Sequence, residues 1–358
     1  MKDLSVSTPG RICLFGEHQD YLGLPIIAGA ISLRIEITGN HSASKDVIID
    51  LPDIQSSEIF TIDAVWDTYS QTDFFKSSIS VLKREGYKFS AGIECQVKSQ
   101  IPIKSGTSSS AALVVSWINF LTRMSIQNKA CSPEEIARLA VLAEVAELSG
   151  AGGIMDQYST AIGDVIFLDP SAPEALIKMN PNLGTIILGD SKESKETQDM
   201  LLRVKRPVLK IIEIIKKEDP DFTIKNVSII DADSYEKVLS EQQLKLLITT
   251  LKNRDITYKA KEELMKPVTN ITKIGILVNN LQKILRDSLK ISTEKIDNMV
   301  AAALDAGAYG AKINGSGGGG CMFAMTINNP GRIARAIERQ GGKAYIVRID
   351  RGTEAIYN

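Results

Sequence analysis

Three polar side chains lie directly after an apolar strand in the N-terminal segment PGRICLFGEHQDY, residues 9–21. Glu17, His18 and Asp20 stand together at the turn that ends this strand. The hydroxyl groups of a polyol pair bidentately with carboxylates and imidazole, so this combination suits polyol recognition. Arg11 lies inside the apolar strand, and a solvated turn does not account for it. From these residues alone, a polyol site and an ordinary solvated turn both remain open.

A second segment, PIKSGTSSSAAL at residues 102–113, feeds small polar residues into the start of a predicted helix. Free backbone N–H groups at the positive end of a helix dipole form an anion site that suits phosphate. A serine hydroxyl there could also reach a magnesium ion. The segment is not a Walker A loop, because no Gly-Lys-Ser/Thr follows. An ordinary serine-rich helix cap remains the alternative.

A third segment, KINGSGGGGCMFAM at residues 312–325, holds five glycines within six residues. Such a loop has a high conformational entropy cost, which favours close approach of the backbone to a ligand. The segment contains GxGxxG at Gly315, Gly317 and Gly320, but a strand pattern follows it where a dinucleotide-binding fold needs a helix. No acidic residue stands at the distance expected of a ribose ligand, so a nicotinamide-dependent oxidoreductase is disfavoured.

Two acidic residues lie 12 positions apart around a glycine cluster. Asp156 follows Gly152 and Gly153 in the segment GGIMDQYS, downstream of a predicted helix that holds Glu144. Together they could supply one metal ligand and one base. The alternative is that Glu144 and Glu147 lie on a solvated helix face.

Composition excludes several classes of function. The net charge is -1 over 358 residues, which argues against a broad surface for nucleic acid or anionic membranes. Two histidines and four scattered cysteines disfavour zinc and iron–sulfur sites. We find no signal-peptide pattern and no apolar run near the ~20 residues of a membrane helix. We therefore expect a cytoplasmic protein with reduced thiols.

Apolar spacing predicts the elements that position these segments. We expect two strands paired around the Pro9-Gly10 turn, at 4–7 and 11–15, and further strands at 24–37, 91–97, 185–188, 321–327 and 344–349. We expect helices at 66–83, 111–124, 133–148, 205–217, 241–254, 273–288 and 293–306. Ser132, Pro133 and Glu135 predict a capping box at the start of the third helix. Prolines 170, 173 and 181 predict a domain boundary near 170–185.

In this order and spacing, the four segments resemble the GHMP kinase superfamily, most closely the galactokinases. PGRICLFGEHQDY looks like the galactokinase signature, and GGIMDQYS is similar to the family's GIMDQ segment. The resemblance covers residues 8 to about 325. It implies a two-domain α+β fold with the active site in the cleft between domains. Residues 1–180 would form a ribosomal-S5-like N-terminal domain, and residues 181–358 a ferredoxin-like C-terminal domain.

The resemblance also implies roles for single residues, with ATP and Mg²⁺ as cofactors. Asp156 would be the catalytic base and Arg11 the cation that orients it. Ser110 and Glu144 would ligate magnesium. The sugar would be held by Glu17, His18, Asp20 and Gly153. The ATP phosphates would lie against Ser105, Gly106, Thr107, Ser108, Ser109, Ser110, Gly315, Gly317 and Gly318.

Several positions depart from the family pattern. The phosphate loop has Lys104 where glycine is usual and Thr107 where leucine is usual, and Gln19 replaces the common threonine of the signature. The segment at residues 189–201, GDSKESKETQDML, lacks the tyrosine that touches the sugar in galactokinases. Asp190, Ser191 and Lys192 could take its place. Because the departures fall on expected substrate contacts, the sugar need not be galactose.

We therefore expect phosphoryl transfer from MgATP to the anomeric hydroxyl of a galactose-like sugar. A GHMP kinase of a heptose, a uronic acid or mevalonate remains an alternative, as does a catalytically silent regulator that binds nucleotide or sugar. Two acids in GEHQDY favour a sugar over mevalonate, whose carboxylate would call for cations. The expected ligands are ATP and a small sugar, without nucleic acid or membrane. Neither the sugar nor the oligomeric state follows from the sequence.

Overall fold

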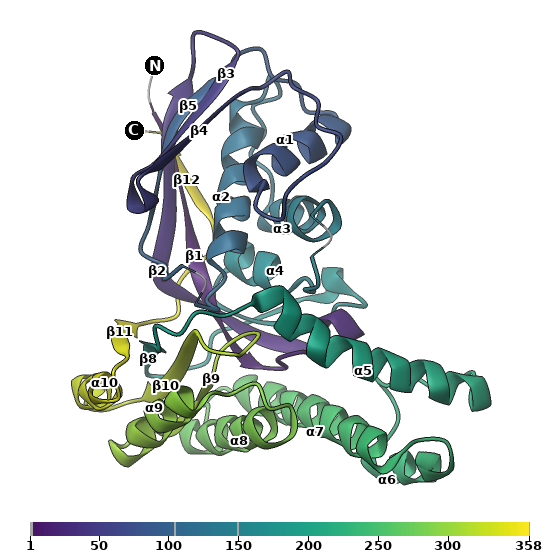
Figure 1. Cartoon of the computed structure of the whole chain (residues 1–358). Coiled ribbons are helices and arrows are strands. Elements are labelled where there is room, and N and C mark those ends of the chain that lie inside the picture. The colour runs from purple at the N-terminus through teal and green to yellow at the C-terminus, as the bar shows by residue number, and fades with distance from the viewer. Residues whose placement is uncertain (1–2, 104, 149, 358) are drawn as a thin grey trace.

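The computed structural model describes residues 3–103, 105–148 and 150–357, so Lys104 lies outside the described residues. The protein has an α+β architecture with two sheets, each packed against its own helices (Figure 1). The two sheet-and-helix halves meet along the middle of the molecule, and the first and last described residues lie close together at one end.

The larger sheet has eight strands, and six of them follow the order β12-β1-β2-β5-β3-β4. The short strands β6 and β7 extend the sheet from the other end of β2. Neighbouring strands are antiparallel except for β3 and β5. The strands are β1 (Leu4–Phe15), β2 (Ile26–His41), β3 (Asp46–Leu51), β4 (Ser56–Thr61), β5 (Ile93–Ser99), β6 (Val165–Leu168), β7 (Ile177–Met179) and β12 (Glu354–Tyr357).

Four helices pack against one face of this sheet (Figure 1). Helix α2 lies at their centre and is buried on nearly all sides, which explains its continuous apolar sequence. Its Trp117 is fully buried, stacks on Phe120 and donates a 3.1 Å hydrogen bond to the Phe75 carbonyl. The helices are α1 (Phe74–Arg84), α2 (Ser109–Met124), α3 (Pro133–Val141) and α4 (Met155–Ile162).

The smaller sheet is antiparallel, in the order β11-β8-β10-β9. Its strands are β8 (Thr185–Asp190), β9 (Gly310–Ile313), β10 (Cys321–Thr326) and β11 (Lys343–Val347). The helices of this half are α5 (Thr197–Glu218), α6 (Ile229–Ala232), α7 (Glu241–Leu264), α8 (Ile271–Lys283), α9 (Glu294–Asp305) and α10 (Pro330–Arg339).

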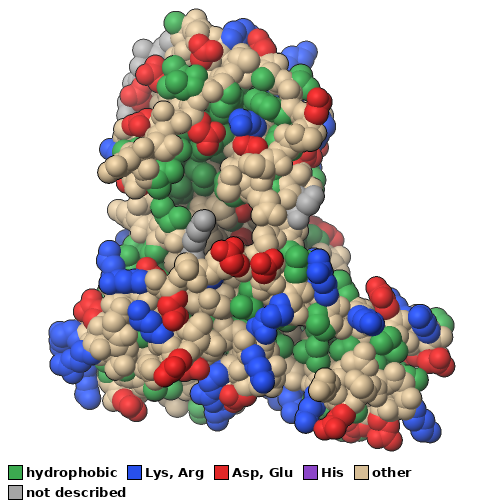
Figure 2. Space-filling view, viewed as in Figure 1, with side chains coloured by type: hydrophobic (Ala, Val, Ile, Leu, Met, Phe, Trp, Pro, Cys, Tyr) green, Lys and Arg blue, Asp and Glu red, His purple; other side chains and the backbone are tan. Residues whose placement is uncertain are grey.

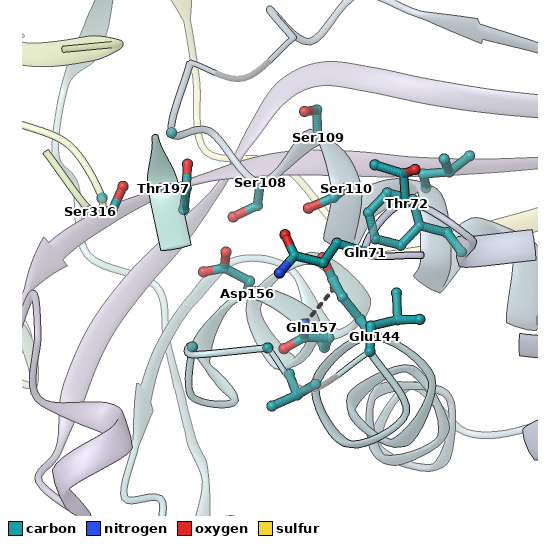
Figure 3. Close-up of a pocket in the computed structure, with 18 of the residues that line it drawn as sticks. Gln71, Thr72, Ser108, Ser109, Ser110, Glu144, Asp156, Gln157, Thr197 and Ser316 are labelled. Atoms are coloured by element: carbon teal, nitrogen blue, oxygen red, sulfur yellow. Dashed lines mark hydrogen bonds between the residues drawn. The ribbon is translucent and has the colours of Figure 1, made fainter. Parts of the chain in front are cut away.

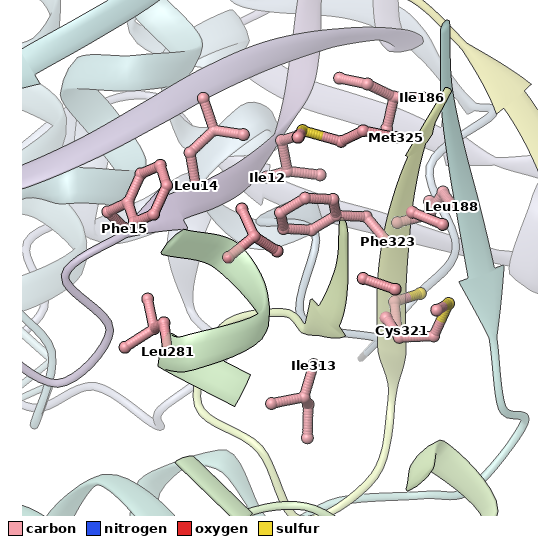
Figure 4. Close-up of a cluster of buried hydrophobic side chains, with 14 of the residues drawn as sticks. Ile12, Leu14, Phe15, Ile186, Leu188, Leu281, Ile313, Cys321, Phe323 and Met325 are labelled. Atoms are coloured by element: carbon pink, nitrogen blue, oxygen red, sulfur yellow. The ribbon is translucent and has the colours of Figure 1, made fainter. Parts of the chain in front are cut away.

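A shared apolar core joins the two halves (Figure 4). Ile12 and Phe15 of β1 pack in the same cluster as Phe323 of β10 and Leu281 of α8. All four side chains are fully buried. The end of β1 therefore belongs to both halves, and this places Arg11 where they meet.

Strand β1 is continuous, so the prediction of two strands around a Pro9-Gly10 turn is wrong. The chain accommodates the pair through a register shift against β2 between Pro9 and Gly10. A second shift follows between Cys13 and Phe15. Such irregularities bend a strand and re-aim its side chains without ending it.

Several helices also differ from the prediction. Helix α5 begins at Thr197, not at residue 205, and α7 ends at Leu264, not at residue 254. Helix α1 begins at Phe74, not at residue 66, because residues 62–73 form a loop. The predicted 133–148 helix is α3 up to Val141 and then a π-helical turn, Leu142–Ala146. Ser132 caps α3 by accepting from the Glu135 N–H at 3.2 Å, but the Glu135 side chain binds Lys129 at 2.8 Å. The cap is therefore present without the reciprocal half of a capping box.

The predicted boundary at residue 180 falls between β7 of the larger sheet and β8 of the smaller one. The C-terminal end then returns to the larger sheet, where β12 pairs with Leu4–Ser7 of β1. The two-domain division at 180 stays a prediction, since the last strand and the shared core both cross it.

Candidate active site

A cavity of about 660 Å³ opens between the two halves. Figure 2 shows it as a hollow across the middle of the face, with hydrophobic side chains gathered along its upper wall. The N-terminal half contributes the end of β1 and the starts of α2 and α4. The C-terminal half contributes Lys195, Thr197, Gln198, Leu201, Gly315 and Ser316.

Arg11 and Asp156 form an ion pair at the floor of this cavity. The Arg11 Nε and Nη2 atoms both donate to Oδ1 of Asp156, at 3.0 and 2.8 Å. Nη1 donates to the Gly106 carbonyl at 2.5 Å, which fixes the guanidinium plane. The Arg11 side chain is 4% exposed and that of Asp156 is 34% exposed. Within the described residues no hydrogen bond engages Oδ2 of Asp156, so this oxygen is available to a ligand.

The start of α2 presents serine side chains to the cavity (Figure 3). Ser108 lies in the left-handed region, at φ 60°, immediately before the first helical residue. Its Oγ is buried and has no hydrogen-bond partner in the described part of the chain. An orphan hydroxyl beside free helix N–H groups matches a phosphate site. Ser109 and Ser110 lie on the same wall.

Ser105 and Thr107 hold this loop in place through their side chains, and their predicted contact with the ATP phosphates stays a prediction. Ser105 and Thr107 are buried, and their hydroxyls lie 2.9 Å apart. The Ser105 carbonyl accepts from the Cys321 N–H at 2.7 Å, and the Thr107 carbonyl accepts from the Arg11 N–H at 3.1 Å. Neither side chain lines the cavity. Thr107 therefore joins the loop to β1 and does not mark a changed substrate contact.

Glu144 lies in the π-helical turn and faces the cavity beside Ser110. Gln157 donates to its Oε2 at 2.6 Å (Figure 3), and the Ser110 hydroxyl also hydrogen-bonds to it. Burial raises the pKa of Glu144 to about 7. A π-helical turn often marks a functional position.

These oxygen donors fit a magnesium site. The described residues hold no cluster of three or more acidic, His or Cys side chains that could bind a metal alone. Mg²⁺ commonly takes one or two carboxylates and completes its shell with substrate phosphates and water. Glu144 with Ser110 matches this pattern, and a bound cation would favour the ionised form of Glu144 that burial disfavours.

Asp20 and Gly153 are in direct contact. A Cβ placed on Gly153 would collide with the Asp20 carboxylate, so any other residue here would require that side chain to move. Asp20 accepts from the Met155 N–H at 3.2 Å, at the start of α4. Burial raises the pKa of Asp20, and the negative charge of Asp156 adds to this effect.

His18 joins the signature turn to the glycine-rich loop. Its two ring nitrogens lie 2.7 Å from the Tyr21 hydroxyl and 3.0 Å from the Ser316 carbonyl. Burial lowers the pKa of His18 to about 4, so the ring is neutral near pH 7. The backbone at His18 is in the left-handed region at φ 61°, which is uncommon for a residue with a Cβ.

Glu17 has a partner that the sequence did not indicate. Lys312 of β9 forms an ion pair with its Oε1, and the two side chains are 0% and 1% exposed. Oε2 of Glu17 has no hydrogen-bond partner among the described residues. Lys312 also lies over the Phe323 ring, 5.0 Å from its centroid, and burial lowers its pKa. Glu17 is therefore shared between the cavity and this buried cation.

The glycine-rich loop divides into two parts. Gly315 lines the cavity, where a Cβ would lie 2.9 Å from the Gly106 carbonyl. Gly317 packs against Ile291, and Gly318 packs against Met200. Neither of these two glycines lines the cavity, although both were predicted to do so. Their φ values of 80° and 76° account for glycine at these positions.

The segment after β8 supplies different residues from those expected. Asp190, Ser191 and Lys192 do not line the cavity, and Lys192 is exposed. Lys195 does line it and is only 8% exposed. Spacing gave no signal for Lys195, because it stands among other charged residues. Its burial depends on the loop fold.

Gln19 is also placed away from the substrate. Its side chain is fully buried and donates to the Thr250 carbonyl of α7 at 3.0 Å. The expectation that its replacement of threonine alters a substrate contact is therefore wrong. Gln19 instead ties the signature turn to α7, as does Asn253, which donates to the Glu17 carbonyl at 2.9 Å.

The remaining end of the cavity is mainly apolar. Phe74, Val97 and Leu113 line the cavity, as do Gln71 and Thr72 of the loop before α1. Figure 3 shows Thr72 on one side of the serines and Thr197 and Ser316 on the other, with the Gln71 amide drawn between the serines and Asp156. The site therefore runs from an apolar compartment, past the start of α2, to the acidic end at Asp156.

Three family models match the chain. The model of the GHMP kinases N terminal domain matches residues 73–164, and that of the GHMP kinases C terminal region matches residues 260–344. The galactokinase galactose-binding signature matches residues 2–41. These regions hold the start of α2, the Asp156 segment, the glycine-rich loop and the signature turn.

Relatives include enzymes with two different substrates. A mevalonate kinase of Pyrococcus furiosus is 31% identical over 357 residues, covering 96% of each chain. A galactokinase of the same organism is 26% identical over 345 residues, covering 95% of this chain and 94% of the relative.

Solved structures share the fold. Lactococcus lactis galactokinase, complexed with galactose, superposes with a TM-score of 0.88 at 22% identity, over 98% of this chain and 95% of the other. Methanococcus jannaschii mevalonate kinase superposes with a TM-score of 0.71 at 20% identity, over 97% and 98%. In the part of the chain that the structure describes, no helix has the length and apolarity to cross a membrane.

Proposed function

Because the chain belongs to the GHMP kinase family, we propose that it transfers the γ-phosphoryl group of ATP to the anomeric hydroxyl of a galactose-like sugar. The observation that carries this proposal is the pair of carboxylates, Asp20 and Asp156, at one end of the cavity. Carboxylates accept hydrogen bonds from hydroxyl groups and repel an anionic acceptor. The match to the galactose-binding signature supports the same acceptor class.

In this proposal Asp156 is the general base. Arg11 holds Oδ1 with two hydrogen bonds, which leaves Oδ2 to take the proton of the acceptor hydroxyl. The acceptor oxygen then bonds to the γ-phosphorus, the bond to the bridging oxygen breaks, and ADP leaves. The Arg11 guanidinium also stabilises negative charge on the group in transfer.

GHMP kinases use ATP, generally with Mg²⁺. The N–H groups at the start of α2 and the unpaired Ser108 hydroxyl would bind the phosphates. The apolar compartment would bind the adenine ring of ATP. Ser110 and Glu144 would hold the Mg²⁺, which when bound offsets the negative charge of the phosphates. The acceptor would lie against Asp20, Gly153 and His18, with Oε2 of Glu17 as a further acceptor of a hydroxyl hydrogen bond.

A mevalonate kinase activity is the second candidate, and one observation favours it. The relative with 31% identity is a mevalonate kinase. Mevalonate is a carboxylate, so its binding requires a cation at the acceptor end. Lys205 is one candidate near that end, since its Nζ lies 5.1 Å from the centroid of the Tyr21 ring and donates to the Ala151 carbonyl at 3.2 Å.

The test is ATP consumption with Mg²⁺ against a panel of acceptors. The panel contains galactose, glucose, N-acetylgalactosamine, glucuronate, galacturonate, L-arabinose, L-fucose, a mannose-type heptose and mevalonate. We expect turnover with one neutral sugar and production of its 1-phosphate. Turnover with mevalonate alone would replace the sugar proposal by the second candidate. ATP binding without turnover on any acceptor would favour a silent regulator.

The D156N variant is the matched control for this assay. It keeps the shape of the side chain and removes the base, so we expect kcat to fall by about 100-fold or more. Nucleotide binding should be retained. Near-normal turnover by D156N would contradict the role of Asp156 as the base.

A further inference from the structure

Lys195 is a buried cation at the centre of the cleft. It lies in the loop between β8 and α5, lines the cavity and is 8% exposed. Its Nζ donates to the Ser316 hydroxyl at 2.9 Å. The same atom lies 2.7 Å from the place that a Cβ would take on Gly106. Arg11 binds the carbonyl of Gly106, so two cations lie close to this glycine.

The two cations differ in their partners. Arg11 has a carboxylate partner in Asp156. No carboxylate lies within ion-pair distance of Lys195 in the structure as described, and its one hydrogen-bond partner is a neutral hydroxyl. A buried ammonium without an anion is costly, and such side chains are rarely buried unless they are paired. The arrangement therefore lacks an anion that the bound state would supply.

We propose that Lys195 is a second catalytic cation, which contacts the phosphoryl group in transfer together with Arg11. This inference rests on the proposed function. The position of Nζ, against Gly106 of the phosphate loop and beside the Ser316 hydroxyl, carries it. Charge that develops on the transferred group is stabilised most by cations already held in place in a site that excludes water.

The alternative ligand for Lys195 is a carboxylate of the acceptor. The neighbours of Nζ argue against it, because they are the phosphate loop and the glycine-rich loop. The acceptor end is defined by Asp20, Gly153 and His18. Of these, His18 lies 3.0 Å from the Ser316 carbonyl, but among the described residues Lys195 has no hydrogen bond to any of the three. We therefore assign the phosphoryl group, and the experiment separates the two.

The first measurement is nucleotide binding by calorimetry, without acceptor, to the wild-type protein and the K195M variant. The probes are AMP-PNP and ADP, each with Mg²⁺. Loss of a charged hydrogen bond to the terminal phosphoryl group should weaken AMP-PNP binding by about 10- to 100-fold. ADP affinity should stay within about twofold, because ADP lacks that group. Equal losses for both nucleotides would overturn the assignment to the group in transfer.

The second measurement is steady-state kinetics with the acceptor found in the panel. In K195M we expect kcat to fall by about 100-fold or more, with the KM for the acceptor little changed. K195R keeps the charge and should recover part of kcat. A rise of the acceptor KM alone, with kcat and nucleotide binding kept, would show that Lys195 binds the acceptor and would overturn the proposal.

The third measurement is the thermal stability of the free protein. Loss of a merely structural lysine would lower the Tm. Removing an unpaired buried charge should leave the Tm of K195M unchanged or higher than that of wild type. A lower Tm with both nucleotide affinities intact would make Lys195 structural and overturn the proposal. K192M is the matched control, since Lys192 is exposed three positions away and does not line the cavity.

These measurements also separate the inference from the proposed function. A wild-type protein that binds AMP-PNP but phosphorylates no acceptor in the panel would leave the nucleotide comparison decisive for Lys195. A wild-type protein that binds neither nucleotide would overturn the proposed function, and the Lys195 assignment with it.

Discussion

Arg11 and Lys195 both lie close to Gly106, and among the described residues only Arg11 has a carboxylate partner. This difference gives the two cations different responses to pH. Arginine stays charged at any pH at which the protein folds, whereas a buried lysine loses its proton more easily. Burial and the charge of Arg11 lower the pKa of Lys195 to about 8. Asp156 opposes this effect without cancelling it.

We expect an alkaline fall in activity that reports the loss of the Lys195 charge. As pH rises through about 8, the ammonium deprotonates in the free enzyme, so kcat/KM for MgATP should fall about tenfold per pH unit. The charged and titratable groups around it are Arg11, His18, Asp156 and Cys321. The pKa of His18 is lowered to about 4 and that of Cys321 is raised to about 12, so neither titrates in this window.

The K195R variant is the control for this profile, because arginine keeps its charge up to about pH 12. Its remaining activity should show no fall between pH 7.5 and 9.5, in contrast to wild type. The measurement is initial rate against pH at low MgATP. The same alkaline fall in K195R and wild type would assign it to another group.

At the scale of elements, the acceptor end depends on the contact between the loop before α4 and the turn that holds Glu17, His18 and Asp20. The Gly152–Gly153 pair leads into α4, whose first turn holds Asp156. Asp20 lies against Gly153 and accepts from the N–H of Met155. Backbone contact at a glycine thus sets the distance between the two carboxylates.

We expect G153A to weaken acceptor binding selectively. The added Cβ would collide with the Asp20 carboxylate, which must then move away from the acceptor. The KM for the acceptor should rise by about tenfold or more, as for loss of one hydrogen bond to a charged group. The affinity for MgADP should not change, because α2 is untouched.

The neighbouring glycine offers a matched control for G153A. A Cβ on Gly152 meets nothing within 4 Å. G152A should therefore keep the wild-type KM, and both variants are compared by kinetics and ADP calorimetry. Equal effects of the two substitutions would show that loop flexibility, not the contact with Asp20, controls the site.

At the scale of the whole molecule, the C-terminal end crosses from the smaller-sheet half to the larger one. The chain leaves β11 of the smaller sheet and returns to the larger one, where β12 pairs with β1. On the way, Thr353 places its hydroxyl 2.8 Å from that of Thr8 and accepts from Asn119 of α2 at 2.9 Å. Thr8 and Asn119 are buried, so these partners depend on Thr353.

We expect T353A to destabilise the protein although it lies far from the cavity. Removal of the hydroxyl leaves two buried polar groups unpaired, which should lower the free energy of unfolding by about 1–3 kcal/mol. The measurement is urea denaturation followed by tryptophan fluorescence. T353S keeps the hydroxyl and should lie closer to wild type. An unchanged midpoint in T353A would show that water satisfies both partners.

The sequence by itself determined the family resemblance, the α+β class and the residue types of the site. Short motifs carry this information because their chemistry is local. A helix N-terminus that binds phosphate needs small residues before it, whatever the rest of the fold. The order of the four segments then indicated a kinase. Helix α9 followed from apolar spacing, which depends only on one buried face, whereas α7 continues ten residues past its predicted end at 254.

Tertiary structure alone decided which of these residues meet, because burial and contact arise from packing between segments far apart in the chain. Glu17 and Lys312 are 295 positions apart, and no local pattern joins them. Gly317 and Gly318 have the composition of a ligand loop but pack against Ile291 and Met200. Lys195 belongs to a charged segment of a kind that is usually exposed to solvent. Only the folding of the loop between β8 and α5 buries it beside the phosphate loop.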